Sequence, residues 1–204
     1  MLSLHNLAVA RGGVTVLQGL TLTVASGQAL ILRGPNGSGK TTLLRTLAGL
    51  QQPAEGSFDL PPDSVAYAAH ADGLKSTLTV TENLDFWSRI YGGPAIEHAL
   101  TALNLAQLTR RRAGELSAGQ KRRLGLARLL ITGRPVWLLD EPTVSLDVAS
   151  VALFAEVVRK HLSGGGLAVI ATHVDLGLPE ATILDLDPHR ARTIQSTGFD
   201  EAFA

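Results

Sequence analysis

The sequence lacks cysteine, a net charge and any long apolar run. Without cysteine the fold cannot be held by disulfides, which fits a reducing compartment. The 18 basic and 18 acidic side chains balance, which argues against direct nucleic-acid binding through the phosphate backbone. No apolar stretch approaches the roughly 20 residues that span a bilayer, and the alternating N-terminus lacks the apolar core of a signal peptide. We therefore expect a soluble chain that reaches a membrane only through a partner.

The 204 residues are enough for one domain with a substantial core, and their pattern predicts an α/β fold. Residues 2–9 and 14–24 alternate between apolar and polar side chains, which predicts an N-terminal antiparallel β subdomain. Short apolar strands then alternate with helical segments, which predicts a mostly parallel core sheet covered on both faces. These strands are expected at residues 29–32, 65–69, 136–139, 167–171 and 182–186.

Residues 76–132 have a helical pattern and predict an inserted α-helical lobe. Trp87 and Tyr91 continue the apolar stripe of its first helix. We expect both in the core, with contact to a partner protein as the alternative. Gly92 and Gly93 are expected to end this helix and Pro94 to begin the next.

The stretch GPNGSGKTT, residues 34–42, matches the spacing of loops that wrap a polyphosphate. Its glycines permit a tight turn with positive φ, and successive N–H groups then form an anion-binding nest. Lys40 adds a charge for the β- and γ-phosphates, and Thr41 offers a hydroxyl to Mg²⁺. A buried strand precedes the loop, and a helix with its positive end toward the phosphates follows. The loop is therefore interpreted as a nucleotide site, against the alternative of a glycine-rich turn with an unrelated lysine.

Two further buried strands end in polar side chains. One ends in Asp140 and Glu141; beside a phosphate loop, the first can hold Mg²⁺ and the second can polarise a water aimed at the γ-phosphate. The other ends in His173. A histidine there can be an ordinary core residue, but the strand ends of such sheets meet at the ligand crevice. We therefore favour a γ-phosphate contact for His173.

Ser117, Gly119 and Gln120 precede another predicted helix. A serine in this position can simply cap the helix, or the helix start can be a second anion site. Its place shortly before the acid-tipped strand favours the anion site. The basic cluster of residues 121–123 follows directly, and we expect it to be solvated, with an effect on the phosphates or a partner as the alternative.

In this order the motifs resemble the ATP-binding subunits of ABC transporters, over Leu2 to about Leu186. The resemblance includes LSAGQ as the signature and Ser145-Leu146-Asp147 as the D-loop. It implies a P-loop NTPase fold, with residues 1–204 as a single ABC-ATPase domain that hydrolyses ATP with Mg²⁺. It also implies a head-to-tail homodimer, in which the signature of one copy closes over the ATP on the phosphate loop of the other. Opening of the dimer then moves integral membrane subunits.

The resemblance implies roles for individual residues, and two of them depart from the family pattern. Arg11 stands where an aromatic side chain usually stacks on adenine, which a guanidinium plane can also do. His70 stands where a glutamine usually touches Mg²⁺ and the attacking water, and a solvated loop histidine is the alternative. The implied catalytic residues are Glu141, His173 and His70, and Thr41 and Asp140 are the implied Mg²⁺ ligands. The implied nucleotide-binding residues are Gly34, Pro35, Asn36, Gly37, Ser38, Gly39, Lys40, Thr41, Thr42, Arg11, Ser117, Gly119 and Gln120.

The short chain, His70, the following GLK, LTVTENLDFW and LSAGQKRRLGLARLL resemble the CcmA-type ATPases of bacterial cytochrome c maturation. This implies a subunit on the cytoplasmic face of the inner membrane, with CcmB-like and CcmC-like membrane partners. ATP hydrolysis would then drive haem export or release. The alternatives are export of another small substrate and a soluble ABC ATPase without a transport role.

Overall fold

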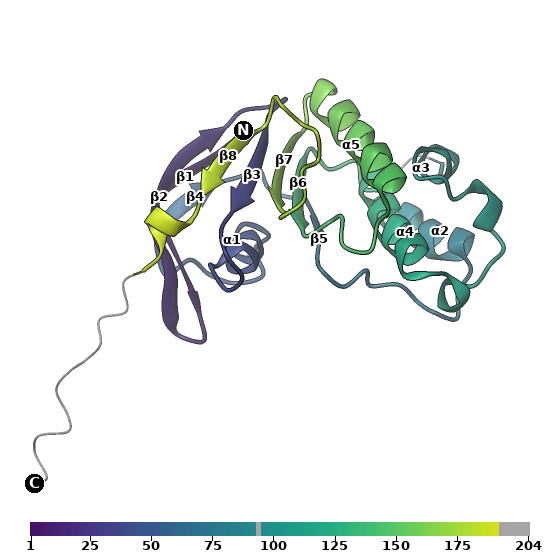
Figure 1. The fold of residues 1–204 in the computed structure, drawn as a ribbon, viewed down its shortest axis with the longest axis horizontal. Helices are drawn as coiled ribbons and strands as arrows, with labels where there is room; N and C mark the ends of the chain where they lie inside the picture. The colour runs from purple at the N-terminus through teal and green to yellow at the C-terminus, as the bar shows by residue number, and fades with distance from the viewer. Residues whose placement is uncertain (93–94, 192–204) are drawn as a thin grey trace, which may run out of the picture.

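Two β-sheets and a group of helices build the fold in the computed structural model, which describes residues 1–92 and 95–191 (Figure 1). The smaller sheet and the helical lobe lie at opposite ends of the molecule, with the larger sheet between them. Gly92 ends the first helix of the lobe with φ of 57°, as predicted. Gly93, the predicted helix start at Pro94 and the tail from Arg192 lie outside the described residues.

The smaller sheet is antiparallel and has the strand order β2-β1-β4. It consists of β1 (Leu2–Arg11), β2 (Val14–Val24) and β4 (Glu55–Asp59). Leu4 pairs with Leu22 on one side and with Phe58 on the other. The alternating N-terminal pattern therefore predicted this sheet correctly, because one face is buried and the other is open to solvent.

The larger sheet has the order β5-β6-β7-β3-β8, and all four pairings are parallel. Its strands are β3 (Ala29–Arg33), β5 (Val65–Ala68), β6 (Val136–Asp140), β7 (Leu167–Ala171) and β8 (Thr182–Asp185). Every residue of β6 and β7 is buried, as expected for central parallel strands. The predicted α/β fold with a parallel core sheet is confirmed.

Helices cover both faces of the larger sheet. On one face α1 (Lys40–Leu47) packs between the two sheets through Leu43, Leu44 and Leu47. On the other face lie α4 (Ala118–Ile131) and α5 (Val148–Ser163). Alternate residues of β6 point to opposite faces of the sheet, as the two-residue period of a strand requires. Leu138 lies in the core on the α1 face, and Trp137 lies in the core on the face covered by α4 and α5.

The lobe consists of α2 (Val80–Tyr91) and α3 (Glu97–Ala102), which both pack on α4. Trp87 is only partly buried and Tyr91 is 38% exposed, so the prediction that both are core residues is wrong. Arginine side chains pack on both rings, with Arg128 5.0 Å from the Trp87 centroid and Arg134 5.6 Å from the Tyr91 centroid, and the two rings stack on each other with centroids 5.9 Å apart. Short 3₁₀ helices lie at Ala106–Leu108, Ala113–Glu115 and Asp187–His189.

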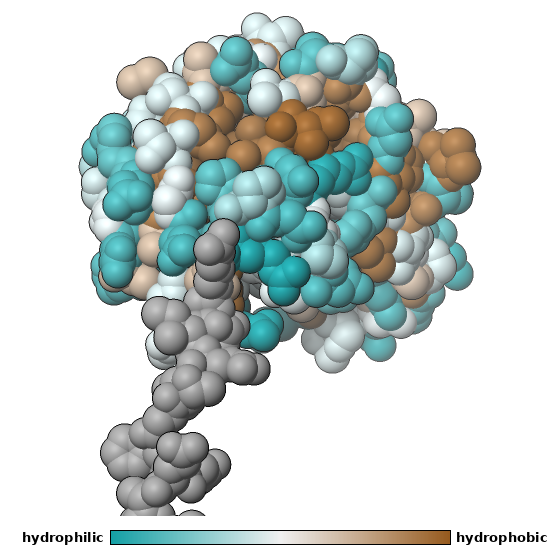
Figure 2. Space-filling model, turned by 60° about the vertical axis from the view of Figure 1, so that its left-hand side comes forward, coloured by the Kyte–Doolittle hydropathy of each residue, from teal (hydrophilic) through white to brown (hydrophobic). Residues whose placement is uncertain are grey.

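The surface of the described chain offers apolar area without a membrane-spanning element. None of the helices in residues 1–92 and 95–191 is both long and apolar enough to cross a bilayer. Figure 2 shows a band of apolar side chains across an otherwise mostly hydrophilic face. Apolar surface of this kind is typical of contacts with other proteins.

A stacked pair of rings joins β6 to α5 at the start of the strand. Trp137 and His161 have ring centroids 3.7 Å apart and planes 8° apart. Burial lowers the pKa of His161, although its contact with the Leu167 carbonyl acts in the opposite direction. The folded protein therefore holds this imidazole in its neutral form more strongly than the unfolded chain does.

We expect this pair to make stability fall in mild acid. The unfolded chain binds the His161 proton with an ordinary pKa of about 6.5, so stability is complete above that pH and is lost as the pH falls through the lower folded pKa. Thermal unfolding measured between about pH 7 and about pH 5 should show this loss. His161→Phe keeps a flat ring without a proton site and should reduce the loss; an unchanged acid dependence would contradict the prediction.

Candidate functional site

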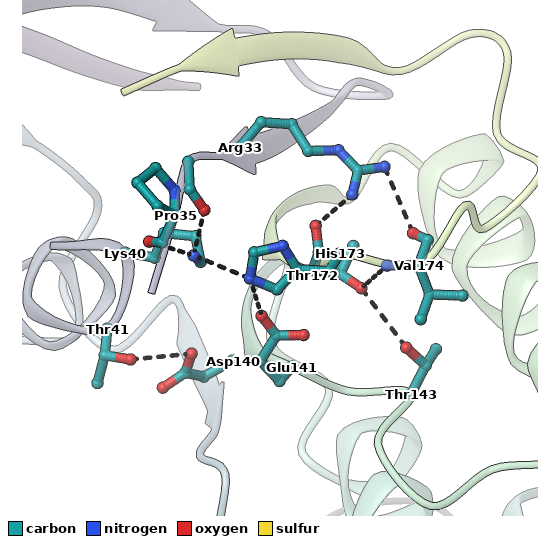
Figure 3. Close-up of polar contacts among 11 residues, drawn as sticks. Arg33, Pro35, Lys40, Thr41, Asp140, Glu141, Thr143, Thr172, His173 and Val174 are labelled. Atoms are coloured by element: carbon teal, nitrogen blue, oxygen red, sulfur yellow. Dashed lines mark hydrogen bonds and ion pairs between the residues drawn. The ribbon is translucent and has the colours of Figure 1, made fainter. Parts of the chain in front are cut away.

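The ends of three parallel strands bring the predicted site residues to one edge of the larger sheet (Figure 3). Ala171 of β7 pairs with Leu32 of β3 on one side and with Asp140 of β6 on the other. The segments that follow these strands therefore start level with one another. They carry the phosphate loop, Glu141 and His173, which makes this edge the candidate site.

The phosphate loop requires glycine for steric reasons at two positions. Gly34 has φ of 152°, and an added Cβ would lie 2.7 Å from Ser38 Oγ. Gly39 has φ of 102°, and its Cβ would lie 2.9 Å from the side chain of Leu17 on β2. The loop thus folds tightly on itself and against the smaller sheet.

The start of α1 has hydrogen-bond donors but no side-chain acceptor. Gly39 is its N-cap residue and supplies no capping side chain, and no acidic residue stands in the first turn. Within residues 1–92 and 95–191, the buried Ser38 Oγ has no hydrogen-bond partner. Free N–H groups and a positive helix end fit the phosphate groups of a nucleotide.

Lys40 is buried, and its ammonium contacts two backbone carbonyls and an imidazole nitrogen. Its Nζ donates to the carbonyls of Gly34 at 2.7 Å and Pro35 at 3.1 Å, and lies 3.2 Å from Nε2 of His173. It forms no ion pair with any acidic residue in the described ranges. A buried ammonium without a counter-ion favours an anionic ligand beside it.

Two acids face this lysine from the end of β6. Glu141 Oε1 lies 3.5 Å from His173 Nε2, and Asp140 Oδ1 accepts a hydrogen bond of 3.2 Å from Thr41 Oγ1. Burial and the Asp140 charge raise the pKa of Tyr67 to about 12, so its phenol stays protonated beside that carboxylate. A hydroxyl and a carboxylate are oxygen donors of the kind that Mg²⁺ prefers, and the remaining ligands are usually phosphates and water.

A cavity of about 160 Å³ opens between the phosphate loop and the acids. Arg11, at the end of β1, is one of its lining residues and comes from the smaller sheet; its contact with the base stays a prediction. The lining residues are Arg11, Asn36, Gly37, Ser38, Gly39, Lys40, Thr41, Thr42, Asp140 and Glu141.

Ser117, Gly119 and Gln120 lie elsewhere, at the start of α4, and none of them lines this cavity. Ser117 and Gln120 form a capping box. The backbone N–H of Gln120 donates to Ser117 Oγ at 3.3 Å, and the backbone N–H of Ser117 donates to Gln120 Oε1 at 3.0 Å. A Cβ on Gly119 would lie 2.8 Å from the carbonyl of Ser145, so glycine lets α4 approach this loop. The capping role is present, and a role in closing an anion site requires another molecule.

His70 is exposed, and its imidazole forms no hydrogen bond or ion pair with the residues described here. Only its backbone carbonyl is engaged, by Arg122 at 3.2 Å. Among the described residues the His70 side chain therefore has no bond to Glu141, and its contact with Mg²⁺ and the attacking water stays a prediction.

Two arginines near the site were missed or misjudged from the sequence. Arg33, at the end of β3, donates to the carbonyls of Thr172 at 2.5 Å and Val174 at 3.4 Å, on either side of His173 (Figure 3). Arg122 was expected to be solvated and is 4% exposed, so that expectation is wrong. Its spacing of three, four and seven residues to buried Gly125, Leu126 and Leu129 was the signal that could have placed it on the inner face.

Comparisons with known proteins agree with this geometry. The family model described as ABC transporter matches residues 17–144. A protein of Rhodobacter capsulatus named cytochrome c biogenesis ATP-binding export protein CcmA is 62% identical over 203 residues, covering 100% of this chain and 95% of the relative. The protein of the same name from Cereibacter sphaeroides is 64% identical over 204 residues, covering 100% of this chain and 97% of the relative.

Solved structures show the same likeness. A putative ABC transporter ATP-binding protein from Pyrococcus furiosus is similar with a TM-score of 0.84 and 25% identity, covering 93% of this chain and 99% of that chain. An inward-facing putative metal-chelate type ABC transporter is similar with a TM-score of 0.77 and 26% identity, covering 91% of this chain and 79% of that chain.

Replacing Lys40 by alanine should weaken nucleotide binding by about 10- to 100-fold, because a charge-assisted contact to phosphate contributes about 1.5–3 kcal/mol. Titration with a fluorescent ATP analogue measures the change. Lys160→Ala removes an exposed lysine from α5 and is the matched control. Equal affinity of the Lys40→Ala variant and the parent would show that Lys40 does not contact the phosphates.

Proposed function

The chain belongs to the ABC transporter family, among the relatives named CcmA, and on this premise we propose that it hydrolyses ATP to drive export in cytochrome c biogenesis. The observation that carries the proposal is the contact of Lys40 and Glu141 with the same His173 nitrogen, at 3.2 Å and 3.5 Å. A phosphate-binding cation, a carboxylate and an imidazole thus share one point at the strand ends.

The residues support a simple division of work on ATP. The loop N–H groups and Lys40 bind the β- and γ-phosphates. Glu141 orients a water and accepts its proton while the water oxygen attacks the γ-phosphorus, and the bond to the bridging oxygen breaks to give ADP and phosphate. His173 contacts the γ-phosphate. Thr41 and Asp140 would hold Mg²⁺, which would neutralise charge on the phosphates.

The site is proposed to be completed by a second copy of this chain. Ser117, Gly119 and Gln120 carry hydrogen-bonding groups at a helix start but do not reach the cavity that holds Lys40. Val144, next to the Ser145 that Gly119 approaches, is 43% exposed, and Val148 at the start of α5 is 88% exposed. Exposed apolar side chains next to the site suit a contact between copies, and a head-to-tail pair would place each signature over the phosphate loop of the other.

The membrane subunits are proposed to dock on the helical lobe. Phe86 and Ile90 are 52% and 55% exposed and stand one turn apart on α2. Next to them, Trp87, Tyr91 and Arg128 line a cavity of about 290 Å³. This surface suits an apolar element of a CcmB-like or CcmC-like subunit, which would hold the chain on the inner face of the membrane. The proposed cargo is haem, in line with the cytochrome c role of the named relatives.

Glu141→Gln tests the chemistry. It removes the base but keeps the shape of the side chain, so ATP binding should persist while phosphate release falls by at least about 100-fold. Phosphate release and analogue titration on the purified chain measure the two effects. A variant that releases phosphate at the parental rate would exclude Glu141 as the base.

The same substitution in cells tests the biological role. A strain whose only copy carries Glu141→Gln should lose covalent haem from its c-type cytochromes, which haem staining of denaturing gels detects. A strain with Lys160→Ala is the control and should keep them. Normal c-type cytochromes together with an inactive ATPase would reject the role in cytochrome c biogenesis and leave the ATPase assignment intact.

A further inference from the structure

Arg122 joins α4 to the catalytic end of β6 from a buried position. It follows Gln120 by two residues on the same helix. Its guanidinium donates to three consecutive backbone carbonyls, those of Asp140 at 3.1 Å, Glu141 at 2.8 Å and Pro142 at 2.9 Å. An arginine fork can satisfy several acceptors at once with a fixed geometry, which a lysine cannot do.

The same guanidinium holds the loop that follows β5. It donates to the carbonyls of Ala69 at 3.0 Å and His70 at 3.2 Å, and to Asp72 Oδ1 at 2.7 Å. A second feature of α4 accommodates this loop, because a Cβ on Gly125 would lie 2.8 Å from Asp72 Oδ1. On one face of α4, the arginine therefore holds residues 69–72 by hydrogen bonds, and the glycine leaves the space that Asp72 occupies.

Glu141 has a backbone conformation that needs support. Its φ is 47°, in the left-handed region that residues with side chains rarely adopt. Its N–H donates to the Ala171 carbonyl at 2.8 Å, and its own carbonyl accepts from Arg122. A strained conformation persists when neighbouring contacts hold it from several sides. This conformation is the one that directs the Glu141 carboxylate toward His173.

We infer that Arg122 is a positioning residue for ATP hydrolysis, which fixes the Glu141 backbone and ties it to residues 69–72 and to the helix that begins with Ser117–Gln120. It contacts backbone rather than the proposed site of the reacting groups, so it acts through Glu141. Because Arg122 lies in the first turns of α4, a movement of the N-terminal end of this helix displaces the Arg122 side chain and with it the Glu141 carbonyl that it binds. The inference rests on the ATPase function proposed above.

Arg123 provides a matched control on the same helix. It also donates to two backbone carbonyls, those of Leu103 at 3.0 Å and Asn104 at 2.8 Å. These bonds remain within the helical lobe and do not reach β6. Replacing Arg123 by methionine therefore removes a cation and two carbonyl contacts while leaving the Glu141 backbone as it is.

The test compares Arg122→Met, Arg122→Lys and Arg123→Met in the purified full-length chain, with thermal unfolding to confirm that each is folded. We expect both Arg122 variants to lower kcat by about 100-fold, as for a small displacement of a catalytic group, with unchanged affinity for a fluorescent ATP analogue. Hydrogen exchange should become faster in peptides covering residues 139–144 and 69–72. Arg123→Met should keep the parental kcat and change exchange only near Leu103.

Arg122→Lys carries the test if Arg122→Met does not fold, because it keeps the charge and loses only the fork. Gly125→Ala is an independent perturbation that displaces Asp72 and should speed exchange at residues 69–72 alone. A folded Arg122 variant with parental kcat, or an equal loss in Arg123→Met, would overturn the inference. If the parent itself did not hydrolyse ATP, the proposed function would fail, and unchanged exchange at residues 139–144 in the Arg122 variants would separately reject the inference.

Discussion

The register of β7 between β3 and β6 is the constraint on which the site depends. Ala171 pairs with Leu32 and with Asp140, so the segments leaving three buried strands begin at the same level. Parallel strands place their carboxyl ends at one edge, and here that edge receives a cation from α1, a carboxylate after β6 and an imidazole after β7. A shift of any strand by one residue would turn its side chains to the opposite face and separate these groups.

Around this edge lies one part of the proposed nucleotide site, and the residues proposed to complete it from a second copy lie apart from it. The phosphate loop, Arg11 and the acids share a cavity, whereas the signature residues at the start of α4 lie outside it. Arg122 connects the two proposed parts, because it lies on α4 and donates to the backbone carbonyl of Glu141. Through this bond the position of the helical lobe and that of the Glu141 backbone depend on each other.

The sequence predicted the features that follow from local pattern. Alternating and continuous apolar stretches predicted the strands of both sheets, and the spacing of the glycines predicted the position of Lys40 in the loop. These features depend on residues that are neighbours in the sequence. Contacts between distant segments were harder to predict. Arg122 was assigned to the surface because of its charge. A helix can bury an arginine, however, when carbonyls distant in the sequence accept its hydrogen bonds. Trp87 and Tyr91 were assigned to the core because periodicity does not reveal which side chains cover a helix face, here Arg128 and Arg134.

The central claim is that ATP closes two copies of this chain over one another. Light scattering coupled to size exclusion, on the Glu141→Gln variant with saturating ATP, tests it most directly, because lost hydrolysis should leave the closed pair intact. We expect twice the 21.5 kDa mass of the chain with ATP and the single mass with ADP. A single mass under both conditions, with ATP shown to be bound, would contradict it.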